Sequence, residues 1–207
     1  MSLLTIAYFL EDVAQEALLK ALVSRVAVMA GLADSRITHQ VRAAAGGTGT
    51  MLQSLRLFLR DCRDGDVGPF DLLVVGRDSD CRGYTQTRQH LEGIISRSGY
   101  PGACALAIPD PHIERWYLLH PQALQLAVGS SVGPSVPPYR CERAHYKRAL
   151  MNAFRDAAPQ LGGIEWADDV VQHMDFYIAG QNDPAFAYFI QDVRQCLVPF
   201  KGHGAEA

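Results

Sequence analysis

The stretch Asp71-Leu72-Leu73-Val74-Val75-Gly76-Arg77-Asp78-Ser79-Asp80 decides the predicted fold. A short run of leucine and valine that follows a polar residue is typical of a buried strand in a parallel sheet. Asp78 and Asp80 come directly after the run, and both lie on one side of an extended segment because strand side chains alternate. Open parallel α/β sheets bind ligands at the carboxyl ends of their strands. The stretch therefore predicts a buried strand that delivers two carboxylates to a binding edge.

Two like charges this close together are unfavourable unless a cation lies between them, and hard divalent cations prefer carboxylate oxygens. The plain alternative is that the two aspartates only cap the next helix, predicted from Tyr84 to Arg97, because Asp is a favoured helix cap. Two further acidic junctions in the chain favour the cation site.

The composition is that of an ordinary globular protein, with 207 residues of which 48% are hydrophobic and 20% charged. A chain of this length is expected to form one domain, or one domain with a small appendage. No apolar run reaches the roughly 18 residues needed to span a bilayer. The apolar N-terminus lacks a basic region and runs into acidic residues, which is not the pattern of a signal peptide. We therefore expect a cytoplasmic protein without membrane contact.

The cysteines and histidines predict neither a zinc site nor a disulfide framework. The five cysteines are odd in number and form no Cys-x-x-Cys pair, and the seven histidines form no His-x-x-x-His pair. The net charge of -3 gives no global nucleic-acid signature, so any nucleic-acid binding needs a local basic patch. The cysteines are Cys62, Cys81, Cys104, Cys141 and Cys196.

A second acidic junction lies near the N-terminus. Residues 3–10 are apolar along almost their whole length and predict a buried strand, and the periodic apolar positions from Val13 to Met29 predict a helix. Glu11 lies between the two, where a carboxylate of a binding site would lie. The alternative is that Glu11 only complements the dipole of the helix.

A third acidic junction follows the predicted strand Cys104–Ile108. Pro109-Asp110-Pro111 ends that strand, and a helix is predicted to begin at His112, so Glu114 lies in its first turn. Each acid alone could serve the helix dipole. Three strand–acid–helix junctions that meet at one sheet edge favour a shared cation site over three independent caps.

The glycine-rich segment 43–50 separates a predicted strand, Arg36 to Ala45, from a predicted helix, Met51 to Cys62. We expect a flexible loop with a Thr50 cap, and the alternative is a phosphate cradle formed by backbone N–H groups. The segment lacks Gly-Lys-Ser/Thr and is therefore not a Walker A loop.

The C-terminal part is predicted to be helical. Residues 128–139 are rich in Gly, Ser and Pro and predict a loop, and residues 201–207 are expected to be disordered. We divide the chain into an α/β core, 1–128, and a helical extension packed on it, 129–200. Helices are predicted over Glu142–Ala158, Trp166–His173 and Pro184–Val198.

The densest basic stretch lies just before and within the first of these helices. Its cations could grip phosphates, or they could form an ordinary solvated helix face. They are Arg140, Arg143, Lys147 and Arg148.

The three acidic junctions, in this order and between parallel strands and helices, resemble the Toprim fold, a Rossmann-like arrangement shared by topoisomerases, primases and overcoming-lysogenization-defect nucleases. More narrowly, the chain is similar to compact Toprim-like bacterial proteins found in phage-defence or mobile-element contexts. Arg77-Asp78-Ser79-Asp80 matches their Arg-Asp-x-Asp motif, and Glu114-Arg115-Trp116 matches their Glu-x-Trp helix start. Glu11 stands for the first motif, Glu-Gly-x-Thr-Glu, but Asp12 replaces its glycine and the threonine is missing. His120 stands where a further acid is often found.

The resemblance implies an Mg²⁺- or Mn²⁺-dependent phosphodiesterase that acts on nucleic acid, DNA rather than RNA. Asp78 and Asp80 would hold the metal, Glu114 would be a further ligand or support one, and Glu11 would act as general base or bridging ligand. Arg77 and Arg82, with the basic stretch of residues 140–148, would position the nucleic-acid backbone.

Two other functions remain open. The departures at Asp12 and His120, and the absence of a strong basic face, favour a catalytically weak or inactive subunit that binds a partner ATPase in a defence complex. A nucleotide-binding enzyme that uses residues 46–49 is a third option. Further copies of the same chain are also expected as partners.

Overall fold

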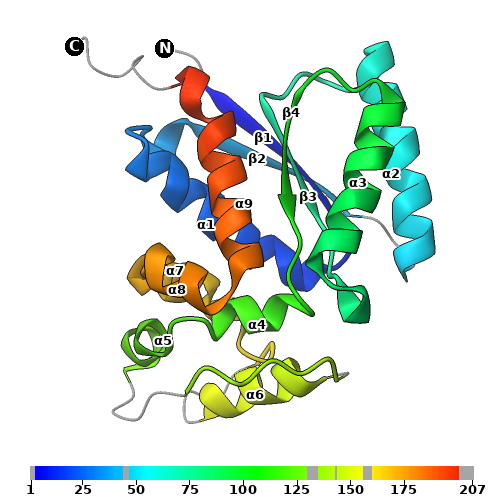
Figure 1. Ribbon diagram of the computed structural model, residues 1–207. Helices are drawn as coiled ribbons and strands as arrows, with labels where there is room; N and C mark the ends of the chain where they lie inside the picture. Colours follow the sequence, from blue (N-terminus) through cyan, green and yellow to red (C-terminus); the bar gives the residue numbers. More distant parts are fainter. Residues whose placement is uncertain (1–2, 44–46, 130–134, 143, 156–159, 201–207) are drawn as a thin grey trace.

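The computed structural model describes residues 3–43, 47–129, 135–142, 144–155 and 160–200 (Figure 1). The described residues form a sheet of four parallel strands in the order β2-β1-β3-β4. The strands are β1 (Leu4–Leu10), β2 (Ile37–Ala43), β3 (Leu72–Gly76) and β4 (Ala103–Ala107). The predicted α/β class, a parallel sheet flanked by helices, is confirmed.

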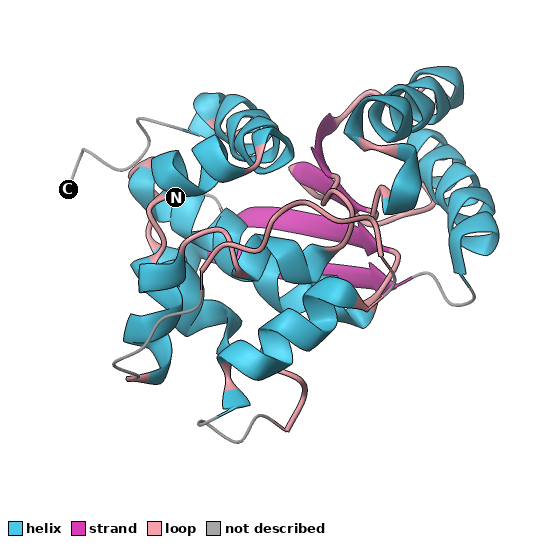
Figure 2. Cartoon of the chain, turned by 60° about the horizontal axis from the view of Figure 1, so that its bottom comes forward, coloured by secondary structure: helices cyan, strands magenta, loops and turns pink. Residues whose placement is uncertain are grey.

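The longer helices cover both faces of the sheet. In Figure 1, α1 and α9 lie on one side and α2 and α3 on the other, and Figure 2 shows helices around the strands from a second direction. Ile6 and Tyr8 of β1 pack into the core with α1 and α9, whereas Ala7 and Phe9 pack into the core with α2 and α3. This alternation follows from the two-residue period of a strand. The long helices are α1 (Val13–Met29), α2 (Gly47–Asp64), α3 (Tyr84–Ser98) and α9 (Pro184–Cys196).

The strand register aligns the carboxyl ends of β1, β3 and β4. Gly76, the last residue of β3, pairs with Leu10 of β1 and with Ala107 of β4. The hydrogen bonding between the strands continues one residue beyond their ends, because Glu11 N donates to Gly76 O at 3.0 Å and Arg77 N donates to Ala107 O at 2.9 Å. The three predicted acidic junctions therefore start from one edge of the sheet.

Shorter helices complete the fold. They are α4 (Ile113–Tyr117), α5 (Pro121–Val128), α6 (His145–Ala153), α7 (Ala167–His173) and α8 (Phe176–Asn182). Of these, α7 packs against α1, and α8 packs against α9. Trp116 of α4 stacks on Phe189 and meets Phe186 edge-on, and both phenylalanines belong to α9. The predicted extension thus supplies a helix that covers the sheet and shares the core cluster of β1 and α1. No helix in the described ranges is both long and apolar enough to cross a bilayer.

Two element predictions were wrong in their bounds. The predicted flexible loop before Thr50 is helical from Gly47, because α2 buries Met51, Leu55 and Leu59 and this packing overrides the weak helix propensity of glycine. The helix predicted from Glu142 begins only at His145, after Ala144 in a left-handed conformation (φ 60°). Residues 44–46, 156–159 and the predicted disordered tail, 201–207, lie outside the described residues.

Candidate functional site

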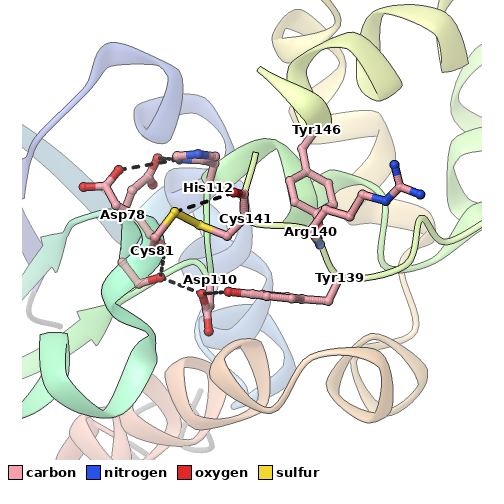
Figure 3. The surroundings of a disulfide bond; sticks show 10 residues. Asp78, Cys81, Asp110, His112, Tyr139, Arg140, Cys141 and Tyr146 are labelled. Atoms are coloured by element: carbon pink, nitrogen blue, oxygen red, sulfur yellow. Dashed lines mark hydrogen bonds and ion pairs between the residues drawn. A yellow bond between two sulfur atoms is a disulfide. The ribbon is translucent and has the colours of Figure 1, made fainter. Parts of the chain in front are cut away.

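The carboxyl edge of the sheet brings Asp78 of the second motif against the loop that follows β4. Asp78 Oδ2 lies 3.3 Å from His112 Nδ1, and Asp80 Oδ1 lies 3.9 Å from the same nitrogen (Figure 3). Backbone hydrogen bonds hold the two loops together, since Ser79 N donates to Pro109 O and Asp80 N donates to Pro111 O. His112 therefore bridges the two aspartates of the motif.

Gln15 connects the first motif to the second. This fully buried side chain of α1 donates from Nε2 to Asp78 Oδ1 at 2.9 Å and accepts from Glu11 N at Oε1, 3.3 Å away. Gly76 makes room for it, because a Cβ at Gly76 would lie 2.8 Å from Gln15 Oε1. Gln15 was not among the predicted site residues, although a polar residue between buried positions of a helix is a signal that the sequence offers.

Both oxygens of Asp78 are thus held by neighbouring donors in a site that is mostly closed to water. Its side chain is 20% exposed, and burial raises its pKa to about 6 against the opposing effect of the hydrogen bonds from His112 and Gln15. The hydrogen bond to Asp78 raises the pKa of His112, and the negative charges of Glu114 and Asp80 act in the same direction. The pKa of Asp78 is therefore about 6, and the pKa of His112 lies above its ordinary value.

Arg77 lies beneath this edge and not on the surface. The residue is 1% exposed, and within the described part of the chain its Nε and Nη1 have no hydrogen-bond partner. Burial lowers its pKa, and the negative charges of Glu11 and Asp80 oppose that effect. The guanidinium is a fixed positive charge inside an acidic site, which offsets part of the repulsion among the carboxylates.

Asp80 is the accessible member of the acidic pair. Its side chain is 51% exposed, and its backbone is in the left-handed region (φ 50°), which Asp tolerates better than most residues. It begins the short 3-10 helix Asp80–Arg82, whose last residue, Arg82, is also exposed. Glu114 is half-buried in the first turn of α4.

The two departures from the Toprim motifs have structural roles. Asp12 is the N-cap of α1, where its Oδ1 accepts from Ala14 N at 3.0 Å. His120 is buried, and its Nδ1 accepts from Asp175 N at 3.3 Å, which ties α4 and α5 to the start of α8. Both positions serve the fold.

The described cations of the basic stretch 140–148 are exposed but do not lie on a single element. Arg140 is exposed, and its side chain points away from Asp78 in Figure 3. Lys147 and Arg148 are exposed on α6, where Arg148 pairs with Glu142 at 2.6 Å. Arg143 lies outside the described residues.

The cysteine spacing suggested no disulfide framework, but the structure contains one disulfide bond. Cys81, next to Asp80, is bonded to Cys141, 60 residues later, with the two Cα atoms 5.6 Å apart (Figure 3). Sequence spacing could not reveal the pair, because tertiary packing alone brings the two loops together. The other cysteines, Cys62, Cys104 and Cys196, are free.

The chemistry of the site suits a hard cation, but the site is not a closed metal cage. In the described ranges there is no group of three or more His, Cys, Asp or Glu side chains arranged to hold a metal ion. A structural zinc site needs such a group. Mg²⁺ does not, since proteins commonly bind it through one or two carboxylates together with substrate phosphates and water. The residues therefore fit a cation that arrives with a phosphate.

Comparisons of the chain with protein-family models, with curated proteins and with solved structures found no match. The resemblance to the Toprim fold rests on the three sequence motifs.

Proposed function

We propose that the carboxyl edge of the sheet is the site of a metal-dependent phosphodiesterase that acts on nucleic acid, DNA rather than RNA. The observation that supports it best is the hydrogen bonding of Asp78, whose two oxygens are fixed by Gln15 of the first motif region and His112 of the third. Structural caps would not need a buried amide to join two separate junctions. Mg²⁺ or Mn²⁺ would be held by Asp78 and Asp80, with Glu11 and Glu114 beside them.

The residues of the chain would prepare the site in three ways. Gln15 and His112 fix the direction in which Asp78 presents its oxygens. Glu11 would accept a proton from the attacking water, and the buried charge of Arg77 would limit repulsion between the carboxylates and the phosphate. A bound divalent cation would activate water and neutralise charge on the phosphate. We also propose that the protein is located in the cytoplasm and that it acts in phage defence or in a mobile-element system.

Cleavage of end-labelled DNA and RNA, single- and double-stranded, with Mg²⁺ or Mn²⁺ tests the proposal. Glu11→Gln should lower the rate by about 10²- to 10⁴-fold, the range for loss of a positioned acid–base group. Asp78→Asn should also lower the rate, because it removes a carboxylate that would hold the cation. Asp66→Asn is the matched control, since Asp66 is an exposed acid in the turn after α2, away from the sheet edge. If both site variants cleave as fast as wild type, the site is wrongly assigned.

A second candidate function is a subunit that binds a partner ATPase without catalysis of its own. The observation that favours it is the buried guanidinium of Arg77, whose positive charge already offsets part of the negative charge of Glu11 and Asp80. This function predicts no cleavage by the isolated protein and copurification with an ATPase from the native cell. Cleavage by the pure chain would exclude it as the main role.

A further inference from the structure

The segment 135–142, here called the strap, runs beside the acidic edge and is bonded to it covalently. Its Cys141 forms the disulfide with Cys81, the residue that follows Asp80 (Figure 3). Tyr139 of the strap also contacts the loop after β4 and the side chain of Arg115, which lies 5.6 Å from the centre of its ring. Tyr139 Oη donates to Asp110 Oδ1 at 3.0 Å, and Ser79 Oγ donates to the same oxygen at 2.7 Å.

On its other side, the strap contacts the first turn of α6. Arg140 N donates to Tyr146 Oη at 2.8 Å, and the same hydroxyl donates to Pro138 O at 3.2 Å. The strap therefore lies between α6 and the loop that carries Asp78 and Asp80. Its only covalent link to that loop is the disulfide, because Cys81 and Cys141 are 60 residues apart in the chain.

The accessibility of the two sulfur-bearing residues suits exchange with an external thiol. Cys81 and Cys141 are both exposed, and exposed disulfides are among the labile ones. Attack by the chain's own free cysteines is disfavoured. Burial raises the pKa of Cys62 to about 11 and also raises the pKa of Cys104 and Cys196, so all three are protonated at neutral pH.

We propose that Cys81–Cys141 is a thiol–disulfide exchange site for an external dithiol, and that its reduction releases the strap from the acidic edge. A thiolate of the dithiol attacks one sulfur and breaks the S–S bond, and the departing cysteine sulfur takes a proton. The second thiol of the dithiol then attacks the mixed disulfide and frees the other cysteine, which also takes a proton. Two electrons pass to the protein, and the dithiol becomes a disulfide. This chemistry is independent of whether the edge hydrolyses phosphodiesters.

Release would act on the motif itself, because Cys81 lies inside the 3-10 helix that begins with Asp80. With the disulfide open, the covalent link between the strap and the 79–82 loop would be lost. The described contacts that would remain between them are the hydrogen bonds of Tyr139 and Ser79 to Asp110 and the contact of Cys81 Sγ with Cys141 O, 3.7 Å away. In a reducing compartment, disulfides of this kind usually act as sensors and not as structural links.

Hydrogen–deuterium exchange of the full chain, with thiol counting by alkylation, tests the proposal. When alkylated in denaturant, oxidised protein should react at three of its five cysteines, and protein first equilibrated with reduced glutathione or a thioredoxin-type dithiol should react at all five. On reduction, amides of 139–142 and 79–82 should exchange about 10-fold faster or more, while amides of β1 and β3 stay protected. Cys81→Ser should show the fast pattern in either condition. Cys62→Ser, which removes a free thiol, should respond like wild type.

Three results would overturn the proposal. One is a disulfide that persists in both reductants, and another is a reduced wild type whose strap amides exchange at the oxidised rate. The third is faster exchange throughout β1 and β3 on reduction, which would make the disulfide a structural link. The wild-type measurements decide the question even if a cysteine variant fails to fold.

Discussion

Replacing Asp78 by Asn should change how the stability of the protein depends on pH. The carboxyl is 20% exposed and its pKa is raised from about 3.8 to about 6, so the folded state favours the neutral form. Asn is neutral at every pH and nearly the same shape. Its amide can accept from Gln15 Nε2 and donate to the unprotonated Nδ1 of His112, so both contacts of the site persist.

The direction and size of the change in stability follow from the difference in proton binding between the folded and the unfolded state. Between about pH 4 and 6 folded Asp78 binds more protons than unfolded Asp78, so the wild type loses stability as the pH rises through this window. A shift of about two pKa units at about 1.4 kcal/mol each makes the loss about 3 kcal/mol. The raised pKa of His112 adds to it, because that contribution is present below about pH 6.5 and is lost above the folded pKa.

The assay is urea unfolding of wild type and Asp78→Asn at half-unit steps from pH 4 to pH 8. The stability of the variant relative to wild type should rise by about 3 kcal/mol between pH 4 and pH 7. Asp80→Asn is the control, since Asp80 is half exposed and Asn also tolerates its left-handed backbone. A difference between Asp78→Asn and wild type that stays constant over the whole range would refute the reasoning.

Three other substitutions test separate parts of the structure. Gly76→Ala should cost about 1–3 kcal/mol in urea unfolding, because the new Cβ would overlap the Gln15 side chain. Asp183→Ala should cost about 3–5 kcal/mol, because it leaves the buried guanidinium of Arg115 without its carboxylate and removes the N-cap of α9. Lys147→Gln should weaken oligonucleotide binding measured by fluorescence anisotropy. It should also lower the slope of log binding constant against log salt concentration by about 1, as expected for the loss of one phosphate contact.

Each of these has a matched control in the same chain. Gly68→Ala meets only open space and should change stability by less than about 0.5 kcal/mol. Asp175→Ala removes an exposed N-cap without a buried ion pair and should cost only about 1 kcal/mol. Arg148→Gln should affect binding less than Lys147→Gln, since Glu142 already pairs with Arg148. Equal effects within any pair of variants would contradict the corresponding assignment.

The sequence was sufficient for the features that depend on local patterns. The apolar runs of β1 and β3, and the periodicity of α1 and α3, were read within a few residues of their bounds. The junction acids followed from those bounds, because parallel strands end at one edge. The short helix α8 was missed, since seven residues carry little periodicity and the helix depends on its Asp175 cap and the burial of Phe176.

The contacts within the site could not be predicted from local sequence patterns. Gln15 and His112 hold Asp78 across 63 and 34 residues of sequence. The position of Gln15 among buried residues of α1 marks it as unusual, but no local pattern shows that its partner is Asp78. The Cys81–Cys141 bond spans 60 residues for the same reason. The burial of Arg77 was also unexpected, because an arginine after a strand normally reaches solvent. These features depend on packing between elements.

The most direct test of the proposed function is calorimetric titration of Mn²⁺ into the protein with and without a short non-cleavable phosphorothioate oligonucleotide. The proposed site lacks a closed set of metal ligands in the described residues, so the metal alone should bind weakly, and the oligonucleotide should tighten binding by about 10-fold or more. The double variant Asp78→Asn/Asp80→Asn should lose this coupling. A wild-type protein that binds Mn²⁺ no better with the oligonucleotide than without it would contradict the proposed cation-assisted phosphodiester site.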